Sequence, residues 1–433
     1  MRNPLIRPIV LTLALALVAA LEVVAPSAAS AATINVSHGQ SIQAAIDSAS
    51  PGDTIVVAPG TYRENIQINK NDITLQGAGS TDGTQTILTP PSASKATHNS
   101  CFVSGSNFDG ICITNGNPPS GPVTAATALS GDTVSGFLVR GFPGIGIHAY
   151  GAFNVTMDSN RLTNNALDGV AAYAGGGVAI TNSQASGSSE AGFLEADTIG
   201  FFTPTPVPVP NLATIANNTA TNNGAGIEIR DSTDPSTFFD PGNTLANQTI
   251  IDNHVEANCV GILVLDTPNP LQSGESVFGN TVIANNKTCT SLPFVPATVS
   301  GTGILVLGAF ATVRNNTIRD NVPSDIHLPY AGGFVLASYP GGPVITDSSA
   351  AYNTAYGNKP FDIDYQRGGP GRAFTLNTNP RGIGTGIIYS FNNCDTSHPK
   401  LIIIPNLGNA LLPLCRPTAA SQSPGFPGYG PGF

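Results

Sequence analysis

The chain has 433 residues, of which 10% are charged, and its formal net charge is −10 at neutral pH. This acidic balance argues against a nucleic-acid partner, because phosphates require a basic surface, and no polybasic segment is present for a membrane surface. The length would allow two or three ordinary domains, so the organisation must come from patterns along the chain.

Residues 1–32 are typical of an export signal. Arg2 and Arg7 form a basic start, Ile9 to Leu21 is a largely apolar run, and Ala29-Ser30-Ala31 supplies a small-residue cleavage site. The run is shorter than the roughly 18 apolar residues of a membrane span. We therefore expect a secreted protein, extracellular or at the cell surface, with no membrane span in the mature chain.

A short amphipathic helix is predicted at the start of the mature chain. Ser41 can serve as its N-cap, Pro51-Gly52 ends it, and one face carries Ile42, Ala45, Ile46 and Ala49. Strands are predicted over 54–58, 65–68 and 72–76, with turns at APGTY and NKND between them.

One short pattern then returns five times between residues 154 and 321. Its copies align two columns of asparagine, five residues apart. The first column is Asn160, Asn218, Asn253, Asn280 and Asn316, and the second is Asn165, Asn223, Asn258, Asn285 and Asn321. Stacked asparagines can bond to one another from turn to turn, which satisfies polar groups that would otherwise be buried and unpaired.

Six strand-like segments that begin with glycine accompany this pattern. They are GIHAY (146–150), GVAAY (169–173), GFLEAD (192–197), GIEIRD (226–231), GILVLD (261–266) and GILVLG (303–308). The intervals between these glycines are 23, 23, 34, 35 and 42 residues. A recurring unit of this size predicts a solenoid, in which each coil buries its inner face against its neighbours. We interpret residues 33–365 as an all-β parallel β-helix with the N-terminal helix as its cap.

The segment QSIQAAIDSASPGDTIVVAPGTYRENIQINKNDITLQGAG (40–79) resembles the N-terminal cap and first coil of the right-handed parallel β-helix proteins of the pectin-lyase-like superfamily. The asparagine-rich coils resemble the repeat region of the same superfamily, so the similarity covers roughly residues 33–365. It implies the fold but not an activity, because the superfamily includes lyases, hydrolases, esterases, epimerases and surface proteins. The NTD, DD, GHG and RIK series of polygalacturonases, the Arg-x-Pro-x-x-Arg of pectate lyases and a DPHE-like epimerase motif are not found.

The exported chain would carry six cysteines, an even number that favours disulfides in an oxidising compartment. Six cysteines allow fifteen pairings. The preferred set is sequential and pairs Cys101 with Cys112, Cys259 with Cys289, and Cys394 with Cys415. No spacing typical of a zinc site is present.

Insertions interrupt the repeat at 201–210, 233–245 and 292–299. They are either tolerated surface loops or a wall beside the solenoid that covers its outward leucines. Residues 366–416 are predicted to cap the C-terminal end, and the Pro- and Gly-rich residues 417–433 are predicted to be disordered.

Outward positions of the glycine-led strands are the candidate ligand-binding site. They hold His148, Tyr150, Tyr173, Glu228 and Arg230 on neighbouring coils. Aromatic rings, a base and a cation could bind several sugar units and a uronate carboxylate. The alternative interpretation is an ordinary solvated face.

Several other acidic residues are interpreted as metal ligands, turn residues or buried groups. Asp197, Asp231 and Asp266 end three successive strands, where they either hold Ca²⁺ or form turns, and no other cofactor is indicated. Asp325, Asp362 and Asp364 are interpreted as turn residues. Strand parity places Glu195 inward, so either the register slips there or this carboxylate faces a cavity.

These patterns predict a secreted parallel β-helix that recognises an extracellular polysaccharide. Enzymatic activity stays open, as a lyase or hydrolase with Glu228 or His148 as base and Arg230 neutralising substrate charge. A non-catalytic surface or adhesive scaffold is the alternative.

Overall fold

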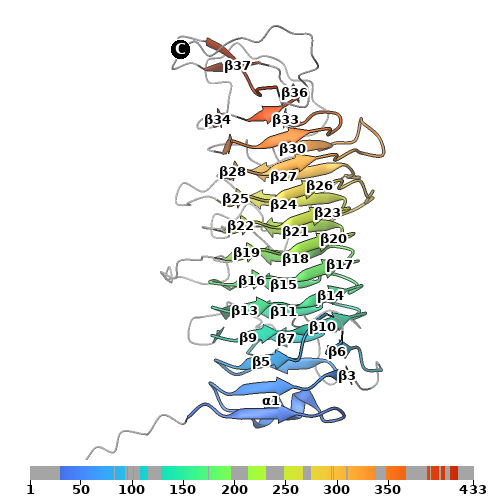
Figure 1. The fold of residues 1–433 in the computed structure, drawn as a ribbon, viewed down its shortest axis with the longest axis vertical. Coiled ribbons are helices and arrows are strands. Elements are labelled where there is room, and N and C mark those ends of the chain that lie inside the picture. Colours follow the sequence, from blue (N-terminus) through green and yellow to red (C-terminus); the bar gives the residue numbers. More distant parts are fainter. Residues whose placement is uncertain are drawn as a thin grey trace, which may run out of the picture.

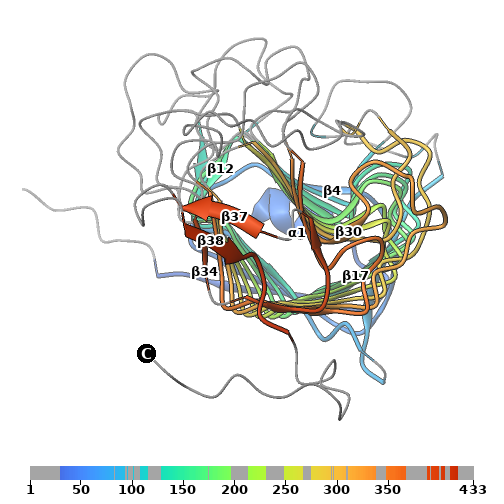
Figure 2. The same cartoon turned by 90° about the horizontal axis from the view of Figure 1, so that it is seen from above.

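The computed structural model describes residues 30–81, 83–92, 95, 101, 108–115, 128–173, 175–196, 213–230, 248–266, 275–293, 295, 297–308, 311–337, 348–366, 388–390, 392–398, 401–404 and 410–417. Within these residues, three long parallel sheets wind around one common axis, one strand of each sheet per coil (Figures 1 and 2). The predicted parallel β-helix is confirmed. No helix among them is long and apolar enough to span a membrane.

Sheet A has 12 strands and sheets B and C have 11 each in the described part of the chain. The strands of sheet A are β1 (Thr33–Val36), β2 (Thr54–Val57), β5 (Thr74–Gly77), β9 (Thr133–Ser135), β13 (Thr156–Asp158), β16 (Ala179–Thr181), β19 (Thr214–Ala216), β22 (Thr249–Ile251), β25 (Ser276–Phe278), β28 (Thr312–Arg314), β31 (Ser349–Ala351) and β34 (Ile388–Ser390). Those of sheet B are β3 (Gly60–Arg63), β6 (Thr86–Thr89), β10 (Phe137–Arg140), β14 (Arg161–Thr163), β17 (Gln184–Ser186), β20 (Thr219–Thr221), β23 (His254–Glu256), β26 (Thr281–Ile283), β29 (Thr317–Arg319), β32 (Thr354–Tyr356) and β35 (Asn393–Cys394).

Sheet C carries the glycine-led strands. It consists of β4 (Ile66–Ile68), β7 (Ile111–Ile113), β11 (Ile147–Tyr150), β15 (Val170–Tyr173), β18 (Ala191–Ala196), β21 (Ala225–Arg230), β24 (Val260–Asp266), β27 (Thr302–Gly308), β30 (Gly332–Ala337), β33 (Ile363–Gln366) and β36 (Ser397–His398). Two small pairs complete the described strands, β8 (Leu129–Ser130) with β12 (Ala152–Phe153) and the antiparallel β37 (Leu401–Ile404) with β38 (Ala410–Pro413).

One element differs from the sequence prediction. The APGTY segment, predicted as a turn, contains strand β3, which pairs in parallel with β6. Tyr62 is the reason, because its ring is buried in the core and its hydroxyl donates to the carbonyl of Ala58. An inward aromatic side chain favours a strand over a solvated turn.

Helix α1 (Ile42–Ser48) lies at the N-terminal end of the stack, across its axis (Figures 1 and 2). Ser41 caps it, since its hydroxyl accepts a hydrogen bond from the Ala44 amide. Glu64 accepts further bonds from the amides of the first turn, and the Lys70 ammonium donates to three carbonyls of the last turn. Side chains from the segments that follow β3 and β4 thus satisfy both ends of the helix.

The corner between sheets A and B always contains two residues from β13–β14 to β31–β32. The first takes a left-handed backbone conformation, as at Asn217 (φ 57°), and the second is the asparagine or serine of the inner column. Asn and Gly tolerate this conformation best among the residues, and they occupy the first position at Asn182, Asn217, Gly279 and Asn315.

Both predicted asparagine columns are confirmed as buried ladders. In the first, the Asn218 side-chain amide donates to Oδ1 of Asn253 at 3.1 Å, and that of Asn253 donates to Oδ1 of Asn280 at 2.9 Å. Each Oδ1 also accepts from a backbone amide of the previous coil, as Asn253 does from Asn218. The ladders extend beyond the predicted copies to Asn353, Asn358 and Asn392.

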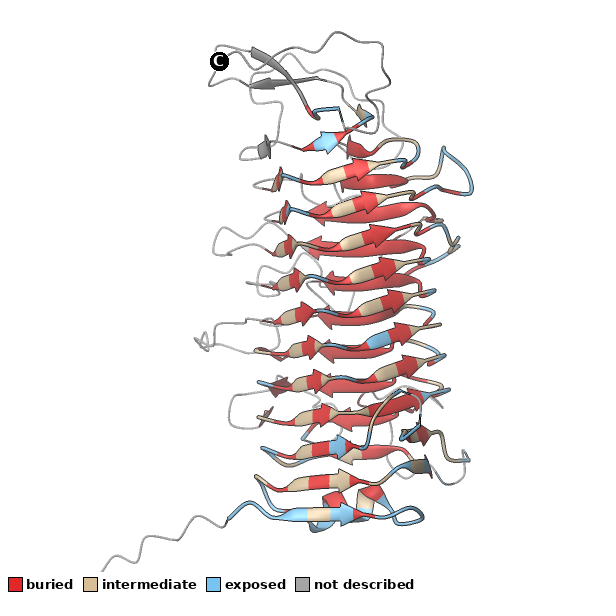
Figure 3. Cartoon of the chain, viewed as in Figure 1, coloured by how far each residue is buried: buried red, intermediate tan, exposed pale blue. Residues whose placement is uncertain are grey.

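From β7 to β30, sheet C is buried on both faces, unlike sheets A and B (Figure 3). Its outward leucines Leu263, Leu265, Leu305 and Leu307 form a hydrophobic cluster with Leu292, Val295 and Val299. The insertion at 292–299 therefore covers the outward leucines, as one of the two alternatives predicted. The other two insertions lie outside the described residues.

The three sequential disulfides are present, joining Cys101 to Cys112, Cys259 to Cys289, and Cys394 to Cys415. The second bond ties the covering insertion to the strand that it covers. Most of the predicted export signal and of the predicted disordered tail lies outside the described residues.

Candidate functional site

The five candidate residues lie together on the outer face of sheet C, and we call them the sheet C cluster. Register aligns Tyr150 with Tyr173, and Tyr173 with Ala196 and then Arg230. In the neighbouring column of the same sheet, register aligns His148 with Ala171, then with Leu194 and Glu228.

All five side chains are buried, and none of these residues is more than 5% exposed. The interpretation of a solvated face is therefore wrong. A second hydrophobic layer, which includes Ile145, Leu194 and the Cys101–Cys112 disulfide, packs around the cluster.

Arg230 joins the cluster across two coils. Its Nη2 donates to the Tyr173 hydroxyl at 2.9 Å, and its Nη1 contacts Oε1 of Glu228 at 3.0 Å. The guanidinium carbon also lies 5.6 Å from the centre of the Tyr173 ring, within reach of a cation–π interaction. The small Ala196 on the intervening strand leaves room for this long side chain.

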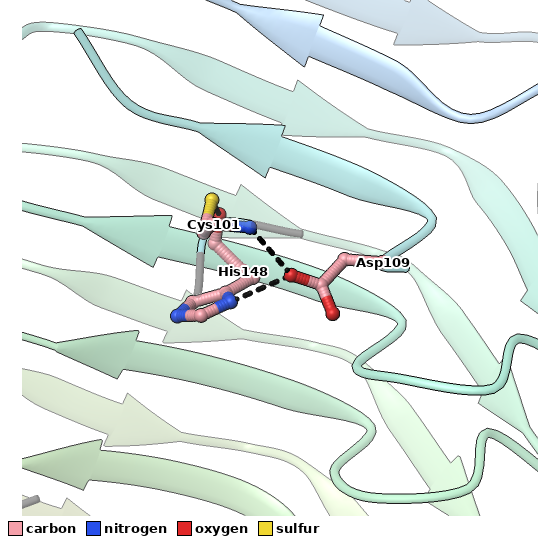
Figure 4. A group of neighbouring side chains, drawn as sticks. All are labelled: Cys101, Asp109 and His148. Carbon is pink, nitrogen blue, oxygen red and sulfur yellow. Dashed lines mark hydrogen bonds and ion pairs between the residues drawn. The ribbon is translucent and has the colours of Figure 1, made fainter. Parts of the chain in front are cut away.

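His148 is held by a buried carboxylate. Its Nδ1 lies 2.8 Å from Oδ2 of Asp109, which also accepts the Cys101 amide (Figure 4). The other oxygen of Asp109 accepts the Ile145 amide at 2.8 Å, so the carboxylate is fixed in place. The imidazole meets the Tyr173 ring edge to face at a centroid distance of 5.1 Å, which links this pair to Arg230.

Sequence reasoning missed three acids of this region, Asp109, Asp168 and Glu190. Asp109 and Asp168 each directly precede the glycine of a sheet C strand, and each accepts a backbone amide one coil on. Extending the glycine alignment by one residue upstream would have revealed Asp168, and adding the segment Gly110–Ile113 to the alignment would have revealed Asp109. Asp168 and Glu190 then influence Arg230 through their charges.

Burial dominates the electrostatics of the cluster. Desolvation raises the pKa of Glu228 to about 7, although Arg230 beside it acts in the opposite direction. Desolvation likewise raises the pKa values of Asp168 and Glu190, and raises the pKa of Tyr173 well above its ordinary value. A carboxyl group that titrates near neutral pH can act as an acid or as a base.

A metal ion does not fit the His148 end of the cluster. The Sγ of Cys101, a carboxylate oxygen of Asp109 and a ring nitrogen of His148 lie within 4.8 Å of one another. The sulfur is bonded to Cys112, however, so it cannot act as a thiolate ligand and only two ligands remain.

The three strand-end acids, interpreted as either calcium ligands or turn residues, are not placed. Asp197 and Asp231 lie outside the described residues, and only the backbone of Asp266 is described. Both interpretations, calcium ligands and turn residues, stay untested predictions.

Glu195 lies inside the solenoid, and the alternative of a register slip is wrong. Its strand stays in register, with Glu195 between Ala172 and Ile229. Desolvation by the apolar core raises its pKa well above the ordinary value, and the nearby Glu275 adds to this effect. Gln248 acts in the opposite direction, and Glu195 is a buried acid that faces the core.

Two of the acids interpreted as turn residues hold the last coil. Asp362 accepts bonds from the amides of Asp395 and Thr396. Asp364 is wrongly interpreted as a turn residue, because it lies within strand β33 and meets Nδ1 of His398 at 3.1 Å. Asp325 accepts the His327 amide in an exposed turn.

Comparison with known proteins identifies the architecture. Residues 52–272 match the model of the family described as the right-handed β-helix region. The A-module of the Azotobacter vinelandii mannuronan C-5 epimerase AlgE6 is similar with a TM-score of 0.50 and 17% identity, over 82% of this chain and 89% of that one. At this identity the likeness concerns the fold alone.

Two further solved structures have lower scores. The A-module of the Azotobacter vinelandii epimerase AlgE4 has a TM-score of 0.49 and 17% identity, over 82% of this chain and 91% of that one. The catalytic domain of a GH87 α-1,3-glucanase has a TM-score of 0.46 and 15% identity, over 84% of this chain and 65% of that one. The search of curated proteins finds no match.

Proposed function

Because this chain belongs to the right-handed β-helix family, we propose that it binds and processes an extracellular polysaccharide through the sheet C cluster. The observation that carries the proposal is the contiguous network from Asp109 through His148 and Tyr173 to Arg230 and Glu228. Charged groups are costly to bury, and this network concentrates them in an otherwise apolar outer layer.

The arrangement suits a linear polymer. Strands of neighbouring coils are about 4.8 Å apart, so a sugar chain running along the axis would meet one cluster residue after another. The AlgE6 A-module, which shares the fold, is named as an enzyme acting on mannuronan, and this supports a polysaccharide as the substrate class.

The proposed roles follow from the chemistry of each group. Glu228, whose pKa is raised to about 7, exchanges a proton with the substrate, and His148 oriented by Asp109 is the second candidate for this role. Arg230 offsets the charge of a uronate carboxylate, and the tyrosine rings pack against sugar faces. Since all these groups are buried, substrate contact requires the outer layer over β11–β21 to move aside.

We also propose that the protein is secreted and that its β-helix forms a single domain. Three disulfides are typical of an oxidising compartment, which agrees with the export pattern of residues 1–32. We place the protein outside the cell as one β-helix domain over 33–365, with 366–416 as its C-terminal cap.

The test is a polysaccharide screen of the mature protein, with and without Ca²⁺. Reducing ends report hydrolysis, and ultraviolet absorbance of unsaturated uronates reports lyase activity. We expect Glu228→Gln to lower turnover by about 10²-fold or more, while the exposed Glu256→Gln on sheet B has no effect.

The non-catalytic scaffold remains the second candidate, because the cluster groups already satisfy one another within the protein. Binding without turnover across pectin, alginate and glycosaminoglycans would support the scaffold. Absence of both binding and turnover would contradict the proposed function.

A further inference from the structure

The outer surface of sheet A changes character along the stack. Its second outward column holds Ser135, Asp158, Thr181 and Ala216 on earlier coils, which are small or polar. The column continues with Ile251, Phe278, Arg314 and Ala351 on later coils. Tyr352 follows Ala351 at the corner with sheet B and is 56% exposed.

Phe278, Arg314 and Tyr352 thus lie on three successive coils, and we call them the sheet A patch. The guanidinium carbon of Arg314 lies 5.1 Å from the centre of the Phe278 ring. This stacking holds the cation against the surface while Arg314 stays exposed. Unlike the buried sheet C cluster, the patch lies at the surface, with Arg314 and Tyr352 exposed and Phe278 half-buried.

The charge of Arg314 points to the kind of ligand. The protein has a formal net charge of −10, yet Arg314 forms no ion pair with any acid in the described part of the chain. The neighbouring Arg319 differs, because it pairs with Asp320 at 2.6 Å. Arg314 is therefore available to a carboxylate from outside the molecule.

Spacing and chemistry together fit an acidic sugar chain. Phe278 and Tyr352 are two coils apart, which is roughly 10 Å along the axis. This separation is comparable to the length of two linked pyranose rings. Aromatic rings pack against the apolar faces of sugars, and guanidinium pairs with carboxylate through two parallel bonds. We infer that the sheet A patch is a second binding surface, separate from the sheet C cluster, for a uronate-containing polysaccharide.

Affinity electrophoresis tests this inference, because it measures binding without turnover. The mature protein is run in native gels containing alginate or polygalacturonate, with dextran as the neutral probe. We expect the acidic polymers to retard the protein and dextran to have little effect. Arg314→Gln should raise the dissociation constant about tenfold, as expected for loss of one charge-assisted pair, and Phe278→Ala and Tyr352→Ala should each weaken retardation.

The matched control is Arg161→Gln, which makes the same charge change on strand β14 of sheet B. It should leave the dissociation constant unchanged. Equal retardation by dextran, or equal effects of Arg314→Gln and Arg161→Gln, would overturn the inference. Self-association at this face, seen as concentration-dependent migration without polysaccharide, would do the same.

A further variant separates this inference from the proposed function. Glu228→Gln should lower turnover by about 10²-fold or more but preserve retardation by alginate. If Glu228→Gln removes retardation and Arg314→Gln does not, the polymer binds at the sheet C cluster and the sheet A patch is not a site. Retardation that depends on Arg314 in a protein without turnover would support the patch and count against the catalytic proposal.

Discussion

At the scale of single residues, Arg230 connects groups that come from coils far apart in the sequence. It contacts Tyr173 and Glu228 and lies near Asp168 and Glu190, whose pKa values burial raises. Arg230 lowers the pKa of each of these carboxyl groups against the effect of burial. The network is therefore sensitive to the loss of Arg230.

Replacing Arg230 with alanine should lower the free energy of unfolding by about 3 kcal/mol or more, because it leaves Glu228 buried without its counter-charge. Urea unfolding measures the change. Arg319→Ala removes an exposed ion pair and should cost at most about 1 kcal/mol. Similar losses for the two variants would show that the buried network does not contribute in this way.

For single residues, prediction from sequence succeeded where the alternation of side chains along a strand determines the face on which a residue lies. It failed where segments distant in the sequence determine whether that residue is buried. Strand alternation was enough to bring His148, Tyr173, Glu228 and Arg230 to one face. Their burial was not predictable, because the outer layer comes from other parts of the chain. Asp109 escaped notice because it precedes its strand.

At the scale of elements, the two asparagine ladders fix the coils to one another. Period and composition were sufficient to predict them, since each rung repeats a left-handed residue followed by asparagine or serine. The predicted turn in APGTY was wrong because a local turn signal competed with the inward packing of Tyr62, a tertiary effect.

Asn253→Ala should reduce the free energy of unfolding by about 2–3 kcal/mol. It removes the acceptor of the Asn218 amide and the donors to Ile215 and Asn280, all of which are buried. Denaturant unfolding is the measurement. Thr219→Ala, on the outward side of β20, is the control and should change stability by less than about 0.5 kcal/mol.

The Cys259–Cys289 bond anchors the insertion that covers the sheet C leucines. Replacing both cysteines with alanine should speed hydrogen exchange of residues 287–299 and lower stability by about 3 kcal/mol. Exchange followed by mass spectrometry resolves the segment. Unchanged protection of 287–299 would mean that hydrophobic packing alone holds the insertion in place.

At the scale of the whole molecule, buried acids set how stability depends on pH. Burial raises the pKa of Asp132 and of Glu228 to about 7, and that of Glu195 well above its ordinary value. The folded state then holds protons that the unfolded chain releases above roughly pH 4. The resulting stabilisation is full below that pH and is lost as the pH rises through about 7.

The protein should therefore have a higher melting temperature at pH 5 than at pH 8, as measured by circular dichroism. Asp132→Asn should flatten part of this slope, because an amide cannot release the proton, while its Oδ1 can still accept the Ile73 amide. A melting temperature that rises from pH 5 to pH 8 would contradict the assignment of neutral buried acids.

The constant two-residue corner between sheets A and B limits where residues, and how many coils, can be added to or removed from the protein. From Asn218 to Asn353, each corner presents the same asparagine rung to the coil above and to the coil below, so neighbouring coils are interchangeable partners at that edge. Length differences between coils are accommodated at the other two corners. A gene duplication or deletion that adds or removes one whole coil would leave the ladder continuous, whereas a single residue inserted at this corner would break it. Growth of this architecture is therefore modular, in steps of one coil, or about 4.8 Å.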